Sequence, residues 1–230
     1  RELARSLVAV GTRHGRRMAV RFTDMSQPLG VAVGHATETL EAFRALRPGH
    51  RDDAPRDLVE VTEALTAAMV HAAGLVADES AALARVRAAW DDGAAWACLE
   101  AWVAAQGGRL DSPPPPPGLT VAEVAGALEA RDAGWVEVTD ARAVGLALAD
   151  LGGARLRVED RIDHAAGIDW LVRTGDQVQR GQPLALLRGG DAERRERARR
   201  RLEGAVAVRP EAVDARPLVI DRLDGDAKMD

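Results

Sequence analysis

The first 112 residues carry apolar side chains mostly every three or four positions, which is the spacing of an amphipathic helix. One segment differs, because Met18 to Thr23 alternates between apolar and polar residues and therefore predicts a strand. Asp78 and Asp92 stand where helix starts favour a capping acceptor. The pattern predicts helices over residues 1–16, 34–46, 56–74, 78–90 and 93–106.

The pattern changes after five consecutive prolines at residues 113–117. Consecutive prolines form polyproline II, which would cover roughly 15 Å at about 3.1 Å per residue. We therefore predict a semi-rigid linker and a domain boundary there, although a recognition role for the prolines is an alternative. Beyond it, two glycine turns flank alternating apolar positions between Thr174 and Leu187. The later residues also predict strands at 134–138 and 168–172 and helices at 140–152 and 191–202.

Composition and charge narrow the possible partners. The chain has 230 residues, of which 47% are hydrophobic and only 3% aromatic, so Ala, Val and Leu must build the core. A net charge of −5 gives no electrostatic footprint for nucleic acid. The arginine run at 199–201 is predicted to be a solvated helix face, because Glu193 and Glu196 interleave with it; a phosphate or nucleic-acid patch is the alternative.

The chain shows no membrane or secretion signal. No apolar run approaches the roughly 20 residues that span a bilayer, and no charged-then-apolar segment follows Arg1. A start without Met, inside a helical pattern, indicates part of a longer protein. The single cysteine, Cys98, is predicted to pack as a small buried hydrophobe. A reducing compartment fits, and we expect a cytoplasmic protein.

No set of residues for acid–base, nucleophilic or metal chemistry is complete in this chain. The five histidines have no metal-ligand spacing, and the only lysine is Lys228. The Gly175–Gly181 hairpin resembles those of biotinyl and lipoyl carrier domains, which need a lysine at the exposed turn. Gln177, Gln179 and Arg180 stand there instead. We predict an α/β fold in which residues 1–112 supply part of a mixed-sheet domain, and residues 118–230 form a smaller α+β, hammerhead-like domain.

Four stretches, in order along the chain, resemble the thymidine and pyrimidine-nucleoside phosphorylase family. The first is TDMSQPLG at 23–30, followed by VGHA at 33–36 and Glu41. The second is AAQGG at 104–108. The others are DARAVGLA at 140–147 with Gly152, Gly153 and EDRID at 159–163, and then Gly167 with residues 174–187.

The resemblance implies phosphorolysis of thymidine or uridine to free base and (deoxy)ribose 1-phosphate, in a homodimer and with no organic cofactor. It also implies an upstream half, before Arg1, that carries the phosphate loop and the residues that grip the pyrimidine. No catalytic residue can then be assigned here, and the isolated chain is expected to be inactive. The alternatives are an AMP phosphorylase, for which a glycine would be expected in place of Met25, and a non-catalytic binding or scaffold fragment.

The resemblance assigns four residues of this chain to the site. Potassium or calcium would be held by the Leu29 and Ala32 carbonyl oxygens and the Glu41 side chain. A hard cation takes oxygen ligands, and carbonyls are available where the backbone is irregular. The alternative is a structural turn with Glu41 solvated on a helix. Leu7 falls where the family has an apolar side chain against the pyrimidine, although ordinary helix core explains it equally well.

Overall fold

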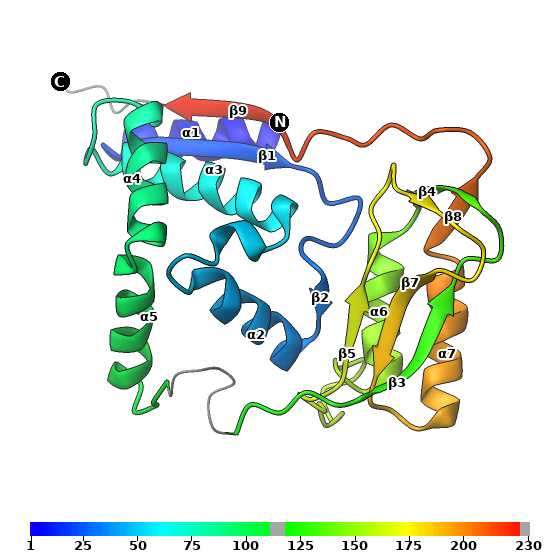
Figure 1. The fold of residues 1–230 in the computed structure, drawn as a ribbon. Coiled ribbons are helices and arrows are strands. Elements are labelled where there is room, and N and C mark those ends of the chain that lie inside the picture. The colour runs from blue at the N-terminus through cyan, green and yellow to red at the C-terminus, as the bar shows by residue number, and fades with distance from the viewer. Residues whose placement is uncertain (111–117, 226–230) are drawn as a thin grey trace. The chain divides into compact units, whose positions relative to one another are not determined.

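The chain forms two compact units in the computed structural model, which describes residues 1–110 and 118–225 (Figure 1). Unit 1 comprises Arg1–Asp24, Leu46–Ala97 and the described residues from Arg216 onward. Unit 2 comprises Met25–Ala45 and the described residues of Cys98–Ala215. Helices occur together with sheets, which confirms the predicted α/β class. The predicted linker at 113–117 lies outside the described residues, so the division into 1–112 and 118–230 remains a prediction.

Unit 1 packs helices against a two-stranded ribbon. Its elements are α1 (Glu2–Arg13), β1 (Met18–Thr23), the short helix η1 (Arg51–Asp53), α3 (Arg56–Ala72), α4 (Glu79–Asp91) and β9 (Val219–Gly225). Strands β1 and β9 are antiparallel, with Arg21 opposite Arg222. Helices α1 and α3 contact this ribbon, and α3 also packs along α4, where Ala67, Ala82 and Val86 form a small buried cluster.

Side-chain caps begin α4 and α5 (Ala94–Ala105) at the two aspartates that the sequence predicts, whereas α1 and α3 have no side-chain cap. Asp78 accepts a hydrogen bond from the Ala81 N–H at 2.8 Å and begins α4. Asp92 accepts one from the Ala94 N–H at 2.9 Å, where α5 begins. Each cap satisfies an amide that has no partner inside its helix. None of the helices in the described ranges is long and apolar enough to cross a membrane.

Unit 2 contains two antiparallel sheets. The first has the strand order β2 (Ala32–Val33), β5 (Gly167–Trp170), β7 (Pro183–Arg188) and β3 (Val124–Glu129), and the second has the order β6 (Gln177–Val178), β4 (Gly134–Val138) and β8 (Val206–Arg209). Its helices are α2 (His35–Leu46, with Leu46 in unit 1), α6 (Ala141–Leu151), α7 (Ala192–Glu203) and the part of α5 from Cys98 onward. Helices α6 and α7 pack side by side next to the strands (Figure 1).

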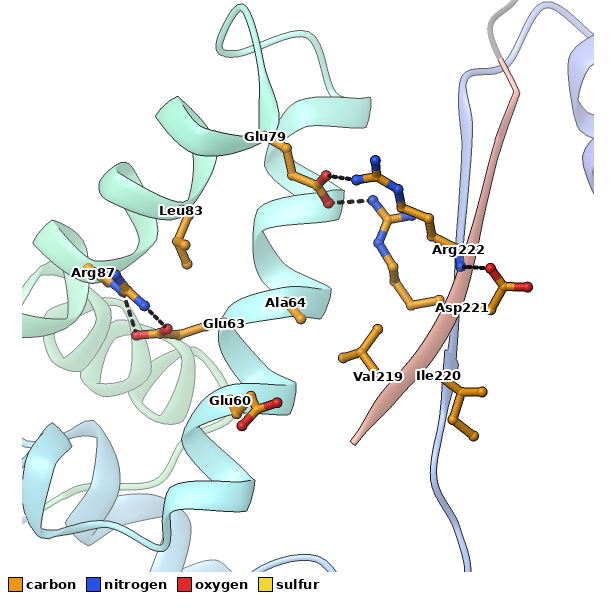
Figure 2. Close-up of a pocket in the computed structure, with 11 residues that line it drawn as sticks. Glu60, Glu63, Ala64, Glu79, Leu83, Arg87, Val219, Ile220, Asp221 and Arg222 are labelled. Atoms are coloured by element: carbon orange, nitrogen blue, oxygen red, sulfur yellow. Dashed lines mark hydrogen bonds and ion pairs between the residues drawn. The ribbon is translucent and has the colours of Figure 1, made fainter. Parts of the chain in front are cut away.

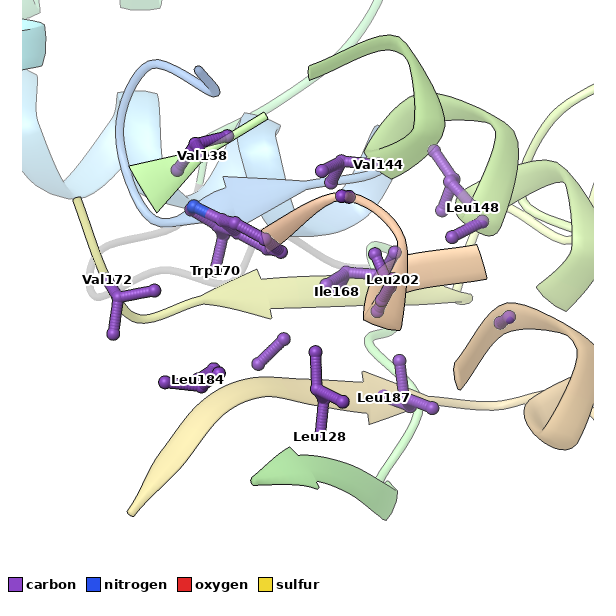
Figure 3. Close-up of a cluster of buried hydrophobic side chains, with 14 of the residues drawn as sticks. Leu128, Val138, Val144, Leu148, Ile168, Trp170, Val172, Leu184, Leu187 and Leu202 are labelled. Atoms are coloured by element: carbon purple, nitrogen blue, oxygen red, sulfur yellow. The ribbon is translucent and has the colours of Figure 1, made fainter. Parts of the chain in front are cut away.

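The main hydrophobic core lies in unit 2 (Figure 3). Trp170 and Ile168 on β5 and Leu202 on α7 are completely buried, and Leu187 on β7 is nearly so. Period-two alternation on the strands and helical spacing on α6 and α7 therefore supply one shared apolar interior. This core anchors β5, the strand that pairs with β2 at Ala32 and Val33.

The structure differs from the sequence predictions in two respects. The helices lie close to their predicted ends, but strands β2, β3, β8 and β9 were not predicted from the sequence. Cys98, predicted to be buried, is exposed, because α5 buries none of its residues. The apolar composition around Cys98 was misleading, since an apolar helix shows only that it could be covered. By contrast, ion pairs of Glu193 with Arg197 at 2.5 Å and of Glu196 with Arg200 at 2.8 Å confirm the solvated face on α7.

Candidate functional site

The segment between β1 and α2 forms an irregular turn, which we call the 27–34 turn after its residues Gln27–Gly34. Gly30 has φ +70° and Gly34 has φ +137°, conformations that L side chains rarely adopt. A Cβ at Gly34 would lie 2.7 Å from the Ala166 carbonyl oxygen, and one at Gly30 would overlap Glu41 Oε2. Position 34 therefore needs glycine for space as well as for backbone conformation, whereas a side chain at position 30 would require the Glu41 carboxylate to move.

Glu41 on α2 reaches back to this turn. Its Oε1 accepts hydrogen bonds from the N–H groups of Val31 at 2.8 Å and Ala32 at 3.2 Å. Glu41 is half-buried, and hydrogen bonds from amides to a carboxylate are stronger than those between neutral groups. The carboxylate is therefore bonded to the turn, which is not the arrangement of a solvated helix side chain.

The strand side of unit 2 holds the same turn from another direction. The Val31 carbonyl accepts a hydrogen bond from the Trp170 N–H at 2.7 Å. The Arg173 guanidinium donates to the Gly30 carbonyl, and the Thr174 N–H donates to Gln27 Oε1 at 3.0 Å. The backbone of the turn is thus fixed by Glu41 on one side and by residues 170–174 on the other.

The Ala32 carbonyl is directed away from β5. Along an antiparallel pair of strands, the pairs of opposite residues alternate between hydrogen-bonded and non-hydrogen-bonded pairs. The Val31–Trp170 pair is hydrogen-bonded, so the next pair, Ala32 with Asp169, belongs to the other kind. The Ala32 N–H and C=O then both point outward from the β2 edge, on the side where its N–H meets Glu41.

The donor types available at this turn, backbone carbonyls and one carboxylate, are those that a hard cation accepts. The structure brings Ala32 and Glu41 together and places Leu29 beside Gly30 in the same turn. Within residues 1–110 and 118–225, no group of three or more His, Cys, Asp or Glu side chains could hold a metal ion. A cation bound at this turn would therefore rest on backbone carbonyls plus one carboxylate, which are oxygen ligands of the kind that potassium and calcium accept.

Leu7 lies in unit 1, on α1, and its side chain is 53% exposed. Leu3 and Val10 on the same helix are exposed as well, at 73% and 57%. The interpretation of Leu7 as ordinary helix core is therefore not supported by the described residues. Its assignment to the pyrimidine remains a prediction.

The charged hollow of unit 1 was not predicted from the sequence. It encloses about 470 Å³ between α3, α4 and β9 (Figure 2). Arg21, only 4% exposed, pairs with Glu79 and with Asp224 at 2.5 Å each. Glu63 accepts hydrogen bonds from Arg87 at 2.7 and 2.9 Å. These ion pairs link the ribbon to α4 and α3 to α4, and they neutralise charges that line the hollow.

The EDRID stretch at 159–163 shapes the loop after α6. Asp160 accepts hydrogen bonds from the Arg157 N–H at 2.8 Å and the Leu156 N–H at 3.0 Å, and these bonds lower the pKa of its carboxyl. Asp163 accepts one from the Ala165 N–H at 3.0 Å. These aspartates thus hold backbone amides in a loop, a role that accounts for acidic residues at those positions.

Comparison with known proteins bears on the whole chain. Residues 135–209 match the family described as pyrimidine nucleoside phosphorylase C-terminal domain. Over 223 residues, the chain is 37% identical to a thymidine phosphorylase of Mycobacterium tuberculosis strain CDC 1551 / Oshkosh, and equally to that of strain ATCC 25618 / H37Rv. The match covers 97% of this chain and 49% of each relative, so the chain spans about half of their length. The resemblance is therefore confirmed: this chain is a member of the thymidine and pyrimidine-nucleoside phosphorylase family, and it carries that family's C-terminal domain at residues 135–209.

Proposed function

We propose that this chain is part of a pyrimidine-nucleoside phosphorylase. In that reaction phosphate attacks the anomeric carbon of thymidine or uridine and the N-glycosidic bond breaks. The pyrimidine leaves with the bonding electron pair, and the products are free base and (deoxy)ribose 1-phosphate. The observation that carries this proposal is the similarity to thymidine phosphorylase over 97% of the chain.

The contribution of this chain to the site would be the 27–34 turn. In the proposal, Leu29 O, Ala32 O and the Glu41 carboxylate bind potassium or calcium. When bound, the cation supplies positive charge beside the phosphate loop that the upstream half would carry. Glu41 supports the assignment because its Oε1 orders the Val31 and Ala32 amides, which leaves the backbone of the turn in one arrangement. Leu7 would contact the pyrimidine ring.

The remaining donors would come from elsewhere in the protein. Phosphorolysis needs anion-binding donors and stabilisation of charge on the leaving base. We propose that these lie in the half of the relatives that this chain does not span, and that the chain alone releases no base. A homodimer in the cytoplasm is part of the same proposal, by analogy with the family.

Two other functions make different predictions. An AMP phosphorylase would act on a purine nucleotide. Met25 argues against this activity, because a glycine would be expected at its position. Met25 is 82% exposed and lies just before the 27–34 turn. A non-catalytic binding or scaffold protein would release no base from any nucleoside. Substrate tests therefore separate all three.

The experiment compares the chain alone with the chain joined to an upstream half. That half comes from its own gene or, failing that, from the mycobacterial relative. Each protein is incubated with thymidine, uridine or AMP, with and without phosphate, and free base and sugar phosphate are quantified. The proposal expects thymine or uracil only from the joined protein and only with phosphate. Release of adenine from AMP would favour an AMP phosphorylase, and release of no base from any substrate would favour a non-catalytic binding or scaffold protein.

A further inference from the structure

Two consecutive peptide groups in the 27–34 turn are held at both ends. The Gly30–Val31 peptide has its C=O bonded to the Arg173 guanidinium and its N–H bonded to Glu41 Oε1. The Val31–Ala32 peptide has its C=O bonded to the Trp170 N–H and its N–H bonded to the same Oε1. A trans peptide is planar, with C=O and N–H on opposite sides, so bonds at both ends fix the orientation of each plane.

These two peptides separate the carbonyls of Leu29 and Ala32. A rotation of either plane would change the direction and spacing of those oxygens. At the Gly30–Val31 peptide, the Arg173 guanidinium donates to the C=O and the Glu41 carboxylate accepts from the N–H. Each charged group polarises the peptide and so strengthens the hydrogen bond at the other end. The Val31–Ala32 peptide has only a neutral donor at its carbonyl end.

Arg173 is itself held in place. Its N–H donates to Asp176 Oδ2 at 2.7 Å, and its carbonyl accepts from the Asp176 N–H at 3.0 Å, which closes a tight turn. Its Nη1 donates to the Val172 carbonyl at 3.1 Å while another nitrogen donates to Gly30. A planar guanidinium can serve two carbonyls at once, and a lysine ammonium lacks that fixed geometry.

We propose that Arg173 is a positioning residue for the cation site, through which residues 170–174 set the orientation of the Leu29 and Ala32 carbonyls. This inference rests on the proposed function, because the cation site is part of it. Arg173 touches neither cation nor substrate in this account. It acts through the Gly30 carbonyl, opposite Glu41.

The test uses Arg173→Gln and Arg173→Lys, with Arg180→Gln as the matched control. Arg180 is an exposed arginine in the neighbouring hairpin. Hydrogen exchange of the Val31 and Ala32 amides is measured in the full chain. In the joined protein, the potassium concentration for half-maximal activity and the KM values for phosphate and nucleoside are measured.

Arg173→Gln should raise exchange at Val31 and Ala32 and raise the half-saturating potassium concentration about tenfold, the effect of losing one charged hydrogen bond. The KM for phosphate should rise more than that for nucleoside. Arg173→Lys should give intermediate values and Arg180→Gln none of these changes. Should Arg173→Gln fail to fold, the Lys variant supplies the same comparison.

The outcomes separate this inference from the proposed function. An inactive joined protein would contradict phosphorolysis, and the exchange measurement would still decide whether Arg173 orders the turn. Unchanged exchange in the Arg173 variants would overturn the inference. So would faster exchange with an unchanged potassium requirement, or an active enzyme that needs no cation, because Arg173 would then order a turn without serving a cation site.

Discussion

The carboxylate of Glu41 occupies the space that a side chain at position 30 would fill, since a Cβ on Gly30 would overlap its Oε2. Gly30 and Glu41 therefore depend on each other. The glycine lets the helix α2 carboxylate approach the backbone, and the carboxylate satisfies the amides that the irregular turn leaves without ladder partners.

This relationship predicts a large cost for Gly30→Ala. Alanine at φ +70° is strained by about 1–2 kcal/mol, and the clash with Glu41 should add about 1–3 kcal/mol. The control is Gly181→Ala, which has φ +80° but nothing within 4 Å of its Cβ, so it carries only the backbone strain. Urea unfolding of both variants measures the difference. In a Glu41→Ala background the extra cost of Gly30→Ala should disappear, and its persistence there would contradict the account.

Glu63 predicts a pH dependence of stability. Hydrogen bonds from Arg87, and also from Arg51, lower the pKa of its carboxyl below the usual 4.5. Because the folded pKa is below the unfolded one, the stabilisation is complete above about pH 4.5 and is lost as pH falls through the folded pKa. The free energy of unfolding should thus decline below about pH 4.5 in the native chain.

The matched comparison is Glu63→Gln against Glu60→Gln. Glu63 is 7% exposed, and losing its charge should cost about 2 kcal/mol at about pH 7. Glu60 is an exposed carboxylate on the same helix, so Glu60→Gln should change the free energy of unfolding by no more than about 0.5 kcal/mol. The difference between native chain and Glu63→Gln should narrow below about pH 4.5. A constant difference from neutral pH down to about pH 3 would show that the ionised form of Glu63 is not the stabilising one.

The hairpin at 174–187 predicts no cofactor attachment. It contains no lysine, and Arg180 stands in the turn between β6 and β7. Expression with biotin and lipoate ligases, followed by intact mass spectrometry, should show an unmodified chain while a carrier domain in the same cells is modified. A mass increase mapped to these residues would reverse this conclusion.

Local pattern predicted the helices because their signals lie within a few residues. Asp140 and Asp191 begin α6 and α7 by accepting from the amides three residues on, and Gly152 ends α6 at φ +96°. Strand β9 was missed although Val219–Gly225 alternates, because its partner strand β1 is remote in the sequence: Arg222 lies opposite Arg21. Strand β3 was missed because Gly126 and two alanines weaken its strand propensity.

The site shows the same limit. Its residues Leu29, Ala32 and Glu41 came from family resemblance, and the irregular turn itself was visible in Pro28 and Gly30. The hydrogen bonds that Glu41 accepts from the Val31 and Ala32 amides could not be deduced from sequence spacing. Arg173 was not singled out because its partner, Gly30, is 143 positions away and a backbone carbonyl leaves no mark in the sequence.

The most direct measurement titrates potassium against the activity of Glu41→Gln in the joined protein, with Glu38→Gln as control. The substituted amide oxygen can still accept from the Val31 and Ala32 amides, so the turn should persist while its only formal negative ligand is lost. Glu38 likewise lies on α2 and accepts from a backbone amide, that of Gly34 at 2.8 Å, but has no proposed cation role. We expect Glu41→Gln alone to need at least about tenfold more potassium, with phosphate use weakened more than nucleoside binding. An unchanged potassium requirement, with stability also unchanged, would contradict the assignment of this turn to the cation.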